Sequence, residues 1–325
     1  MFSRRGRSKT YTEPVSTVEW FELAGFGVGL LSGSFLNVCI ARIPRGESVV
    51  RPGSRCLSCG KPVRWFDNVP VLSWLALRGR CRECKAGISW RYPTVEMGVA
   101  VWFALAGFRL WAALYASGNV ATGSATTQAT EAIALAALGF LLIGLMVMDW
   151  QTHRLPDAFT FTGIGMGFVL TCVRAFFLAP GQGDVVLNTT RQLRMSSPGS
   201  FQAQGNVFMT GSEAMVLGRV GAICGAALLL LLVRWGYKAL RGQDGMGLGD
   251  VKMLAMIAAF LGFWQTIVAL FAGVMAACVY AVAMLALRRA NRQTKLPFGS
   301  FLAAGGLFAA AWGAGIVGWY AGLLR

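Results

Sequence analysis

Two aspartates stand where long apolar segments meet polar sequence, and they are the first candidates for chemistry in this chain. Asp149 ends one apolar run, and Asp250 begins another directly after a Gly-Leu-Gly tripeptide that contains Gly247 and Gly249. The chain has only 14 acidic residues, and a carboxylate at membrane depth is costly, so its default interpretation is functional. Two such carboxylates can share a proton and activate water. The pair predicts an aspartyl protease dyad inside a membrane.

Four cysteines form a second group with recognisable chemistry. Cys56 and Cys59 make one CxxC pair, Cys81 and Cys84 make another, and 21 residues separate the pairs. This spacing predicts a tetrahedral Zn²⁺ site of four thiolates, which is structural because no coordination position stays open for substrate. Two disulfides, or free thiols, are the alternatives, and a reducing cytoplasmic location disfavours the disulfides.

The composition shows which elements must position these residues. The chain is 55% hydrophobic and 14% charged, against about 25% charged residues in soluble proteins. These values predict an all-α polytopic membrane protein. The net charge of +16 would suggest nucleic acid in a soluble protein. Here most basic residues fall in loops, where they set topology and attract lipid headgroups, so membrane lipid is expected as a partner and nucleic acid is not.

We predict about eight transmembrane helices. The apolar segments are 20–43, 93–116, 131–149, 157–179, 214–235, 251–262, 264–287 and 298–323. The sixth is short for a hydrocarbon core of about 30 Å, and residues 251–287 could instead form one bent helix. We place a break at Gly262-Phe263-Trp264-Gln265, and the even count depends on that break.

The segments divide the chain into three parts. A basic tail (1–19) precedes an N-terminal region (20–130), which holds two spans and the polar, cysteine-bearing loop 44–92. About six spans follow in 131–325. The long loop 180–213 is rich in Gly, Ser, Gln and Asn, which is typical of a flexible segment, and we assign it no role.

Basic residues set the expected orientation. Loop 44–92 with its flank at Arg42 carries 11 Lys and Arg, so the positive-inside rule makes this loop cytoplasmic. The basic N-terminal tail then lies outside, against the rule, but its four charges are outweighed. With eight spans, Asp149 and Asp250 both fall on the cytoplasmic side, as does the predicted zinc-binding insert.

Other polar residues near the spans have simpler interpretations. Glu96 is a first-turn acid that the helix dipole favours. Asp157 is expected to cap the fourth span. Lys252 either biases the ionisation of Asp250 or extends to lipid headgroups. Helix polarity also suggests that Asp250, which opens a helix, is the base and that Asp149, which closes one, carries the proton. The helix dipole stabilises the anion at Asp250 and destabilises it at Asp149 by about 0.3–1 kcal/mol each.

Several separate motifs together resemble the type IV prepilin leader peptidases. These are Gly33-Ser34-Phe35-Leu36-Asn37-Val38, Arg42-Ile43-Pro44, the paired CxxC, Asn68-Val69-Pro70-Val71-Leu72-Ser73-Trp74, Arg91-Tyr92-Pro93 with Glu96, Asp149 eight residues before Asp157, and Gly247-Leu248-Gly249-Asp250-Val251-Lys252. The resemblance covers roughly residues 20–300 in the family's order. The GxGD element alone is shared with preflagellin peptidases and presenilin.

The resemblance implies that Asp149 and Asp250 are the catalytic pair, with Gly247, Gly249 and Lys252 as a supporting motif. The substrates would be type IV prepilins or type II secretion pseudopilins, whose basic leader is removed at the cytoplasmic face of the bacterial inner membrane. It also implies methylation of the new N-terminus from S-adenosylmethionine, associated with region 20–130. Glu96 is a candidate for that part, and 131–325 would be the peptidase domain.

Two other functions remain open. The first is a peptidase without methyltransferase activity, because no G-x-G-x-x-G loop supports the second activity and it rests on the resemblance alone. The second is a non-enzymatic transporter or assembly scaffold whose aspartates carry protons. Transporters often have paired broken helices in internal repeats, and this chain has one GxGD break without a matching partner.

Overall fold

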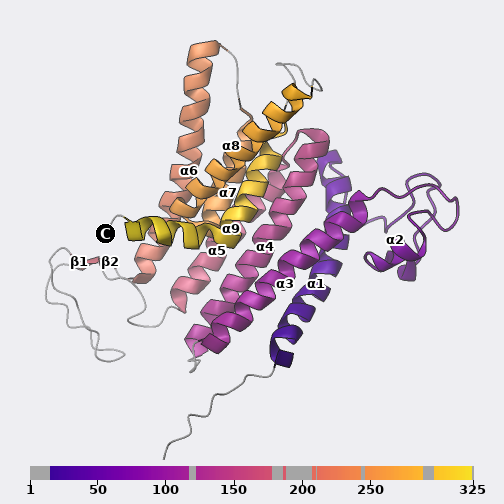
Figure 1. Cartoon of the computed structure of the whole chain (residues 1–325), viewed down its shortest axis with the longest axis horizontal. Helices are drawn as coiled ribbons and strands as arrows, with labels where there is room; N and C mark the ends of the chain where they lie inside the picture. Colours follow the sequence, from indigo (N-terminus) through magenta and orange to yellow (C-terminus); the bar gives the residue numbers. More distant parts are fainter. Residues whose placement is uncertain are drawn as a thin grey trace, which may run out of the picture.

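The computed structural model describes residues 15–116, 122–177, 186–187, 207–209, 211–242, 246–287 and 296–323. Its long helices form one bundle (Figure 1). They are α1 (Val15–Arg42), α3 (Arg91–Ala116), α4 (Thr122–Thr152), α5 (Asp157–Phe176), α6 (Gly211–Arg241), α7 (Leu248–Leu261), α8 (Phe263–Ala286) and α9 (Phe298–Leu323). Each predicted span is therefore a helix. Residues 1–14 of the tail and most of the 180–213 loop lie outside the described residues.

The smaller elements lie between these helices. Two short 3-10 helices, η1 (Ile43–Arg45) and η2 (Trp65–Asn68), and the short helix α2 (Leu72–Ala76) belong to the 44–92 insert. The strands β1 (Val186–Leu187) and β2 (Val207–Met209) pair antiparallel. The insert projects from the side of the bundle where α1 ends and α3 begins (Figure 1).

Of the eight long helices that the structure describes, seven are long and apolar enough to cross a membrane, and α7 is not. With 14 residues at 1.5 Å each, α7 measures about 21 Å, less than the hydrocarbon core of about 30 Å. The prediction that the sixth segment is short is confirmed, and the break lies where we placed it, at Gly262. All residues from Met253 to Phe260 are buried, so α7 is a central helix that its neighbours surround.

The C-terminal end of α7 is formed by Gly262 and an arginine from a neighbouring helix. Gly262 ends the helix with φ 84°, a conformation that L side chains rarely adopt. Arg219 of α6 reaches this end and donates from its guanidinium to the Ala258 carbonyl at 3.3 Å. A cation at a helix C-terminus offsets the negative end of the helix dipole. Arg219 therefore supplies a second donor to a carbonyl that also accepts the Gly262 N–H, and it stabilises this end of α7.

Small residues allow α8 and α9 to pack closely. A Cβ placed on Gly305 would lie 2.2 Å from the Ala269 carbonyl oxygen and 2.6 Å from the Gly273 nitrogen. Both neighbours are backbone atoms, which cannot move without shifting a whole helix. This contact fixes α9, which carries a residue that touches Asp149.

We expect Gly305→Ala to destabilise the protein by about 1–3 kcal/mol, because the added methyl group overpacks this helix contact. Thermal unfolding in detergent measures the effect. Gly315→Ala on the same helix is the matched control, since a Cβ there meets no described atom within 4 Å. Equal stability of the two variants would contradict the expectation.

Three side-chain contacts show which helix ends share one side of the bundle. Arg91 donates to the Gln151 amide oxygen at 2.7 Å, which joins the start of α3 to the end of α4. The starts of α5 and α7, and the start of α9 and end of α4, are joined by contacts described below. We call this side the insert side, because residues 44–92 extend from it.

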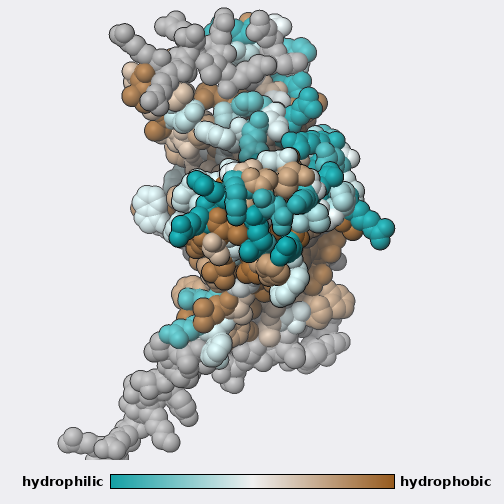
Figure 2. Space-filling model, turned by 90° about the vertical axis from the view of Figure 1, so that its right-hand side faces the viewer, coloured by the Kyte–Doolittle hydropathy of each residue, from teal (hydrophilic) through white to brown (hydrophobic). Residues whose placement is uncertain are grey.

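Figure 2 faces the insert and shows a mainly hydrophilic surface over it, with hydrophobic surface beside and below. The insert holds itself together through polar contacts. The Trp74 indole N–H donates to the Ile88 carbonyl at 3.1 Å, and Arg82 pairs with Asp67 at 2.7 Å. Such a small domain has a limited apolar core and needs a further source of stability.

Candidate active site and metal centre

The four predicted metal ligands come together in the insert. One sulfur-containing turn is closed by a backbone bridge between Arg55 and Pro62, and the other by a bridge between Arg80 and Gly87. These turns bring the Sγ atoms of Cys56, Cys59, Cys81 and Cys84 within 4.8 Å of one another. The Sγ atoms of Cys56 and Cys84 lie 3.7 Å apart, close to the roughly 3.8 Å edge of a tetrahedron with Zn–S bonds of about 2.3 Å.

The pKa values of two of the thiols are also consistent with a cation site. The backbone N–H groups of Cys59 and Ser58 lower the pKa of Cys56 to about 6, which favours the thiolate that a metal binds. The N–H of Ala86 also lowers the pKa of Cys84, but desolvation and the neighbouring cysteine thiols outweigh it and raise that pKa to about 11. A divalent cation relieves this opposition because it stabilises all four thiolates together.

Asp149 lies near the end of α4 and is buried, with 6% of its surface exposed. Ser300, in the first turn of α9, donates its backbone N–H to Oδ2 of Asp149 at 2.7 Å. The Ser300 hydroxyl lies 3.1 Å from the same oxygen and 2.9 Å from the Met146 carbonyl oxygen, so its single proton has two acceptors. A Cβ on Gly299 would come within 3.0 Å of this carboxylate, so the glycine lets the start of α9 approach. Asp149 thus faces a helix N-terminus, which favours negative charge.

Asp250 lies in the first turn of α7 and is 8% exposed. Gly247 is the N-cap residue of α7, in an extended conformation, and its backbone hydrogen-bonds to the Asp250 carboxylate. Asp149 and Asp250 are close enough to interact electrostatically. The structure therefore brings together two buried carboxylates that are 101 positions apart in the chain, both on the insert side.

The other members of the GxGD element have structural surroundings. A Cβ on Gly249 would lie 3.0 Å from Leu155, whose side chain also approaches Gly299. Lys252 pairs with Asp157 at 2.7 Å and lies 5.0 Å from the centre of the Phe161 ring. The ion pair ties the start of α7 to the start of α5, a role that we did not predict for Lys252.

Asp157 departs from its predicted role as a cap. It is the first residue of α5, the N-cap position belongs to Pro156, and no side-chain cap bond is made there. The carboxylate has a cationic partner in Lys252 instead. An ion pair between two chain-distant helix starts cannot be deduced from local capping patterns, which is why this prediction was wrong.

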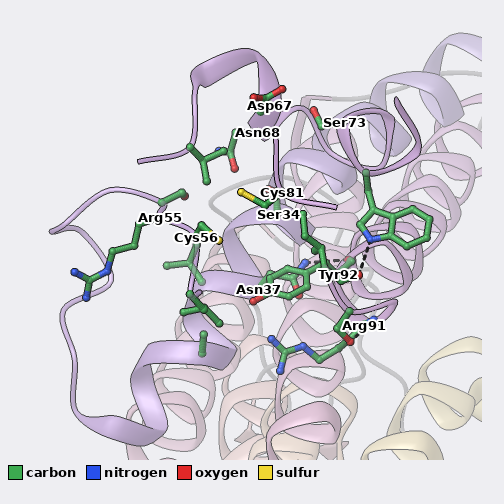
Figure 3. Close-up of a pocket in the computed structure, with 18 of the residues that line it drawn as sticks. Ser34, Asn37, Arg55, Cys56, Asp67, Asn68, Ser73, Cys81, Arg91 and Tyr92 are labelled. Atoms are coloured by element: carbon green, nitrogen blue, oxygen red, sulfur yellow. Dashed lines mark hydrogen bonds between the residues drawn. The ribbon is translucent and has the colours of Figure 1, made fainter. Parts of the chain in front are cut away.

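A large pocket opens between the insert and the bundle, with a volume of about 1040 Å³. Figure 3 shows side chains from α1, the insert and the start of α3 around it, including Ser34, Asn37 and Tyr92. Met146, Val147, Trp150 and Gln151 of α4 also line it. These residues belong to the same end of α4 as Asp149, but neither Asp149 nor Asp250 lines the pocket.

Glu96 belongs to the floor of this pocket and is 7% exposed. Its Oε2 accepts a hydrogen bond of 2.7 Å from the backbone N–H of Val71 in the insert. Val71 has φ 58° and ψ −50°, a strained conformation that costs a β-branched residue about 1–3 kcal/mol. Glu96 therefore attaches the insert to α3 at a strained turn. Its predicted role as a first-turn acid is wrong, because α3 begins at Arg91 and Glu96 lies beyond the first turn.

Three residues at these sites had no individual role in our predictions: Ser300, Gly299 and Val71. The run Leu296-Pro297-Phe298 before Ser300 carries a helix-start signal, because proline favours the first turn of a helix. That signal gives the start of α9 but not its contact with Asp149. The strain at Val71 has no local sequence signal, since valine does not favour positive φ.

Comparison with known proteins gives a consistent result. The protein-family model described as "Bacterial Peptidase A24 N-terminal domain" matches residues 28–110. The family model described as "Type IV leader peptidase family" matches residues 203–282. A protein of Pseudomonas putida is 31% identical over 313 residues, covering 88% of each chain. A protein of Burkholderia pseudomallei (strain 1026b) is 32% identical over 308 residues, covering 86% of this chain and 81% of the relative. Both relatives are named prepilin leader peptidase/N-methyltransferase. No solved structure matches at a significant level.

Proposed function

Because this chain belongs to the type IV leader peptidase family, we propose that it is a membrane aspartic endopeptidase that removes the leader from type IV prepilins or type II secretion pseudopilins and methylates the new N-terminus. The observation that carries the proposal is the pairing of Asp149 and Asp250, two buried carboxylates in electrostatic contact at one end of a membrane bundle. Multi-pass insertion follows from seven apolar helices.

The two carboxylates divide the work of hydrolysis. One ionised carboxylate takes a proton from water while the water oxygen attacks the scissile carbonyl. The protonated carboxyl donates to the carbonyl oxygen, and a proton is later passed to the leaving amine. Two close carboxylates cannot both ionise cheaply, so the pair holds one shared proton.

We propose that Asp149 is the base and Asp250 the proton-bearing partner, which reverses the roles suggested by helix polarity. The polarity argument counted only the helix to which each residue belongs. In the structure Asp149 also faces the N-terminus of α9 and accepts the Ser300 backbone N–H. The Ser300 hydroxyl lies within hydrogen-bond distance of both Asp149 and the Met146 carbonyl. Donors to the charged form of a carboxylate favour that form, and this support is stronger than the weak opposing field of α4.

Ser300→Ala is expected to lower the rate of leader cleavage by up to about tenfold, because the ionised Asp149 loses a hydroxyl that it shares with the Met146 carbonyl, while it keeps the backbone N–H. A hydrogen bond to a charged group contributes about 1.5–3 kcal/mol, and about 1.4 kcal/mol corresponds to tenfold. The pH profile of cleavage should also move. Ser300→Thr retains the hydroxyl and is the matched control. An unchanged rate and pH profile in Ser300→Ala would contradict the assignment.

We assign the second activity to region 20–130 and the peptidase to 131–325, and the family models match on either side of this boundary. S-adenosylmethionine supplies a methyl group to an amine when bound. The pocket beside the insert suits it by volume and by its acidic and aromatic lining, which includes Glu47, Trp74 and Tyr92. The four cysteines would hold a structural Zn²⁺, as their donor set and spacing support.

We propose that the insert side is cytoplasmic and that the protein lies in the bacterial inner membrane, in contact with lipid. The 11 basic residues of loop 44–92 and its flank support this orientation. The active site then lies where a polar leader meets the apolar helix that follows it. That helix must unwind locally before water can reach the scissile bond.

The test uses the purified full-length protein in detergent with a prepilin. Mass spectrometry is expected to show loss of the leader, and gain of one methyl group when S-adenosylmethionine is present. Leader loss without methylation would leave the peptidase-only alternative. An uncleaved prepilin under conditions where the protein is folded would refute the proposed function.

A further inference from the structure

Two buried polar side chains form the floor of the pocket beside the insert. Asn37 of α1 is 3% exposed and Glu96 of α3 is 7% exposed. The helices approach closely at this point, because a Cβ on Gly33 would lie 2.7 Å from the Cα of Glu96. Both side chains line the pocket, and Figure 3 shows Asn37 beside Tyr92 within it. They are held by rigid helices rather than by a loop.

The hydrogen bonds of this pair leave one acceptor without a donor. The Asn37 amide nitrogen donates to the Tyr92 carbonyl at 3.0 Å, and the side chains of Asn37 and Ser34 also hydrogen-bond to the Glu96 carboxylate. The Asn37 Oδ1 atom is buried and has no hydrogen-bond partner among the described residues. A buried acceptor without a donor is unfavourable, so this atom points to a ligand that donates.

The chemistry of the two groups defines that ligand. An amide oxygen next to a carboxylate presents acceptors and a negative charge to a buried position. A primary ammonium group has three N–H donors and one positive charge, and it can satisfy both. A neutral hydroxyl would satisfy the amide oxygen only. The site therefore fits a primary ammonium better than a neutral donor.

The location of the site indicates which molecule supplies the ammonium group. Met146, Val147 and Trp150 of α4 line the same pocket, and Trp150 is the residue after Asp149. A chain end released by cleavage at Asp149 and Asp250 is thus produced at the end of α4 that also lines this pocket. The methyl donor also carries a primary ammonium at its amino-acid end, so the experiment must separate the two sources.

We propose that Asn37 and Glu96 bind the new N-terminal ammonium of the cleaved substrate and position it for methylation, an inference that rests on the proposed function. The Asn37 Oδ1 atom accepts one N–H of the ammonium. Glu96 takes one proton from it and becomes a neutral carboxyl, which leaves an amine with a free electron pair. That neutral amine is the form of the N-terminus that can accept a methyl group.

The test measures binding to the full-length protein in detergent by fluorescence anisotropy. The probes are a labelled peptide with the sequence of a cleaved pilin N-terminus, the same peptide with an acetylated N-terminus, and S-adenosylmethionine. Asn37→Ala and Glu96→Gln should each weaken binding of the free-amine peptide at least about tenfold. Binding of the acetylated peptide and of S-adenosylmethionine should not change.

Glu96→Gln keeps an oxygen for the Val71 N–H, so the insert stays attached. Glu19→Gln is the matched control, because Glu19 is an exposed carboxylate of α1 outside the pocket. Unchanged binding of the free-amine peptide in both test variants would overturn the inference. Weaker binding of S-adenosylmethionine instead would also overturn it and assign the ammonium site to the methyl donor. Failure of wild-type protein to cleave a prepilin would count against the proposed function alone.

Discussion

Replacing Asp149 or Asp250 by asparagine is expected to lower leader cleavage by roughly 10²–10⁴-fold, the range for loss of a general acid or base. Asparagine has the same shape as aspartate, and at position 149 it can still accept the Ser300 N–H. The variant protein should therefore fold normally. The loss is chemical, because an amide can neither take a proton from water nor supply one to the leaving amine. Initial rates on a purified prepilin measure it.

The double variant Asp149→Asn/Asp250→Asn sharpens this test. Residues that act as one unit show strongly non-additive effects, so the double variant should be no slower than the worse single variant. Glu131→Gln is the matched control, since Glu131 lies on the same helix as Asp149 and pairs with Arg174 far from the dyad. An exposed ion pair contributes about 1 kcal/mol at most. A single asparagine variant with more than about a tenth of wild-type activity would refute the paired role.

The second large effect is expected from Cys56→Ser combined with Cys59→Ser. Removing two of the four ligands should abolish metal binding, and structural zinc contributes apparent free energies of about 10–16 kcal/mol in small zinc domains. The insert has polar contacts, a few aromatic contacts such as that of Trp74 with Trp90, and a small core to replace that contribution. We expect elemental analysis to show loss of the bound metal and several-fold less folded protein, measured by size-exclusion chromatography in detergent.

Cys224→Ser combined with Cys278→Ser makes the same chemical change on α6 and α8. Both of these cysteines are exposed on membrane helices and lie apart from the cluster. This control should keep its metal and its yield. Normal stability of Cys56→Ser/Cys59→Ser without bound metal would show that the cluster is not structural.

Much of the fold could be predicted from hydropathy and two local signals. The apolar segments gave every long helix, although α4 begins at Thr122 and α6 continues to Arg241. The predicted segments were 131–149 and 214–235, so helical structure extends beyond the strongly apolar stretch that hydropathy detects. Gly262 marked the break between α7 and α8, since glycine is the residue that adopts its φ without strain. The CxxC spacing predicted the cluster of four cysteines.

The contacts around the candidate sites could not be predicted, because they join helices that are distant in sequence. Ser300 reaches Asp149 across 151 positions, and Lys252 reaches Asp157 across 95. Both pairs depend on how the helices are arranged in the bundle. The expected roles of the two aspartates depended on each residue's own helix, and the contact between α9 and Asp149 is the reason that we propose the reverse. No local pattern in α4 or α9 specifies it.

The short helix α7 has a consequence for how this protein can vary. Most helices of the bundle have a side that faces lipid, where one apolar residue can replace another at little cost. In α7 every residue from Met253 to Phe260 is buried against protein, and Arg219 fixes its far end. Substitutions along α7 therefore should not alternate between tolerated and harmful faces. The helix that carries Asp250 should therefore tolerate fewer amino-acid substitutions than helices that have an exposed side.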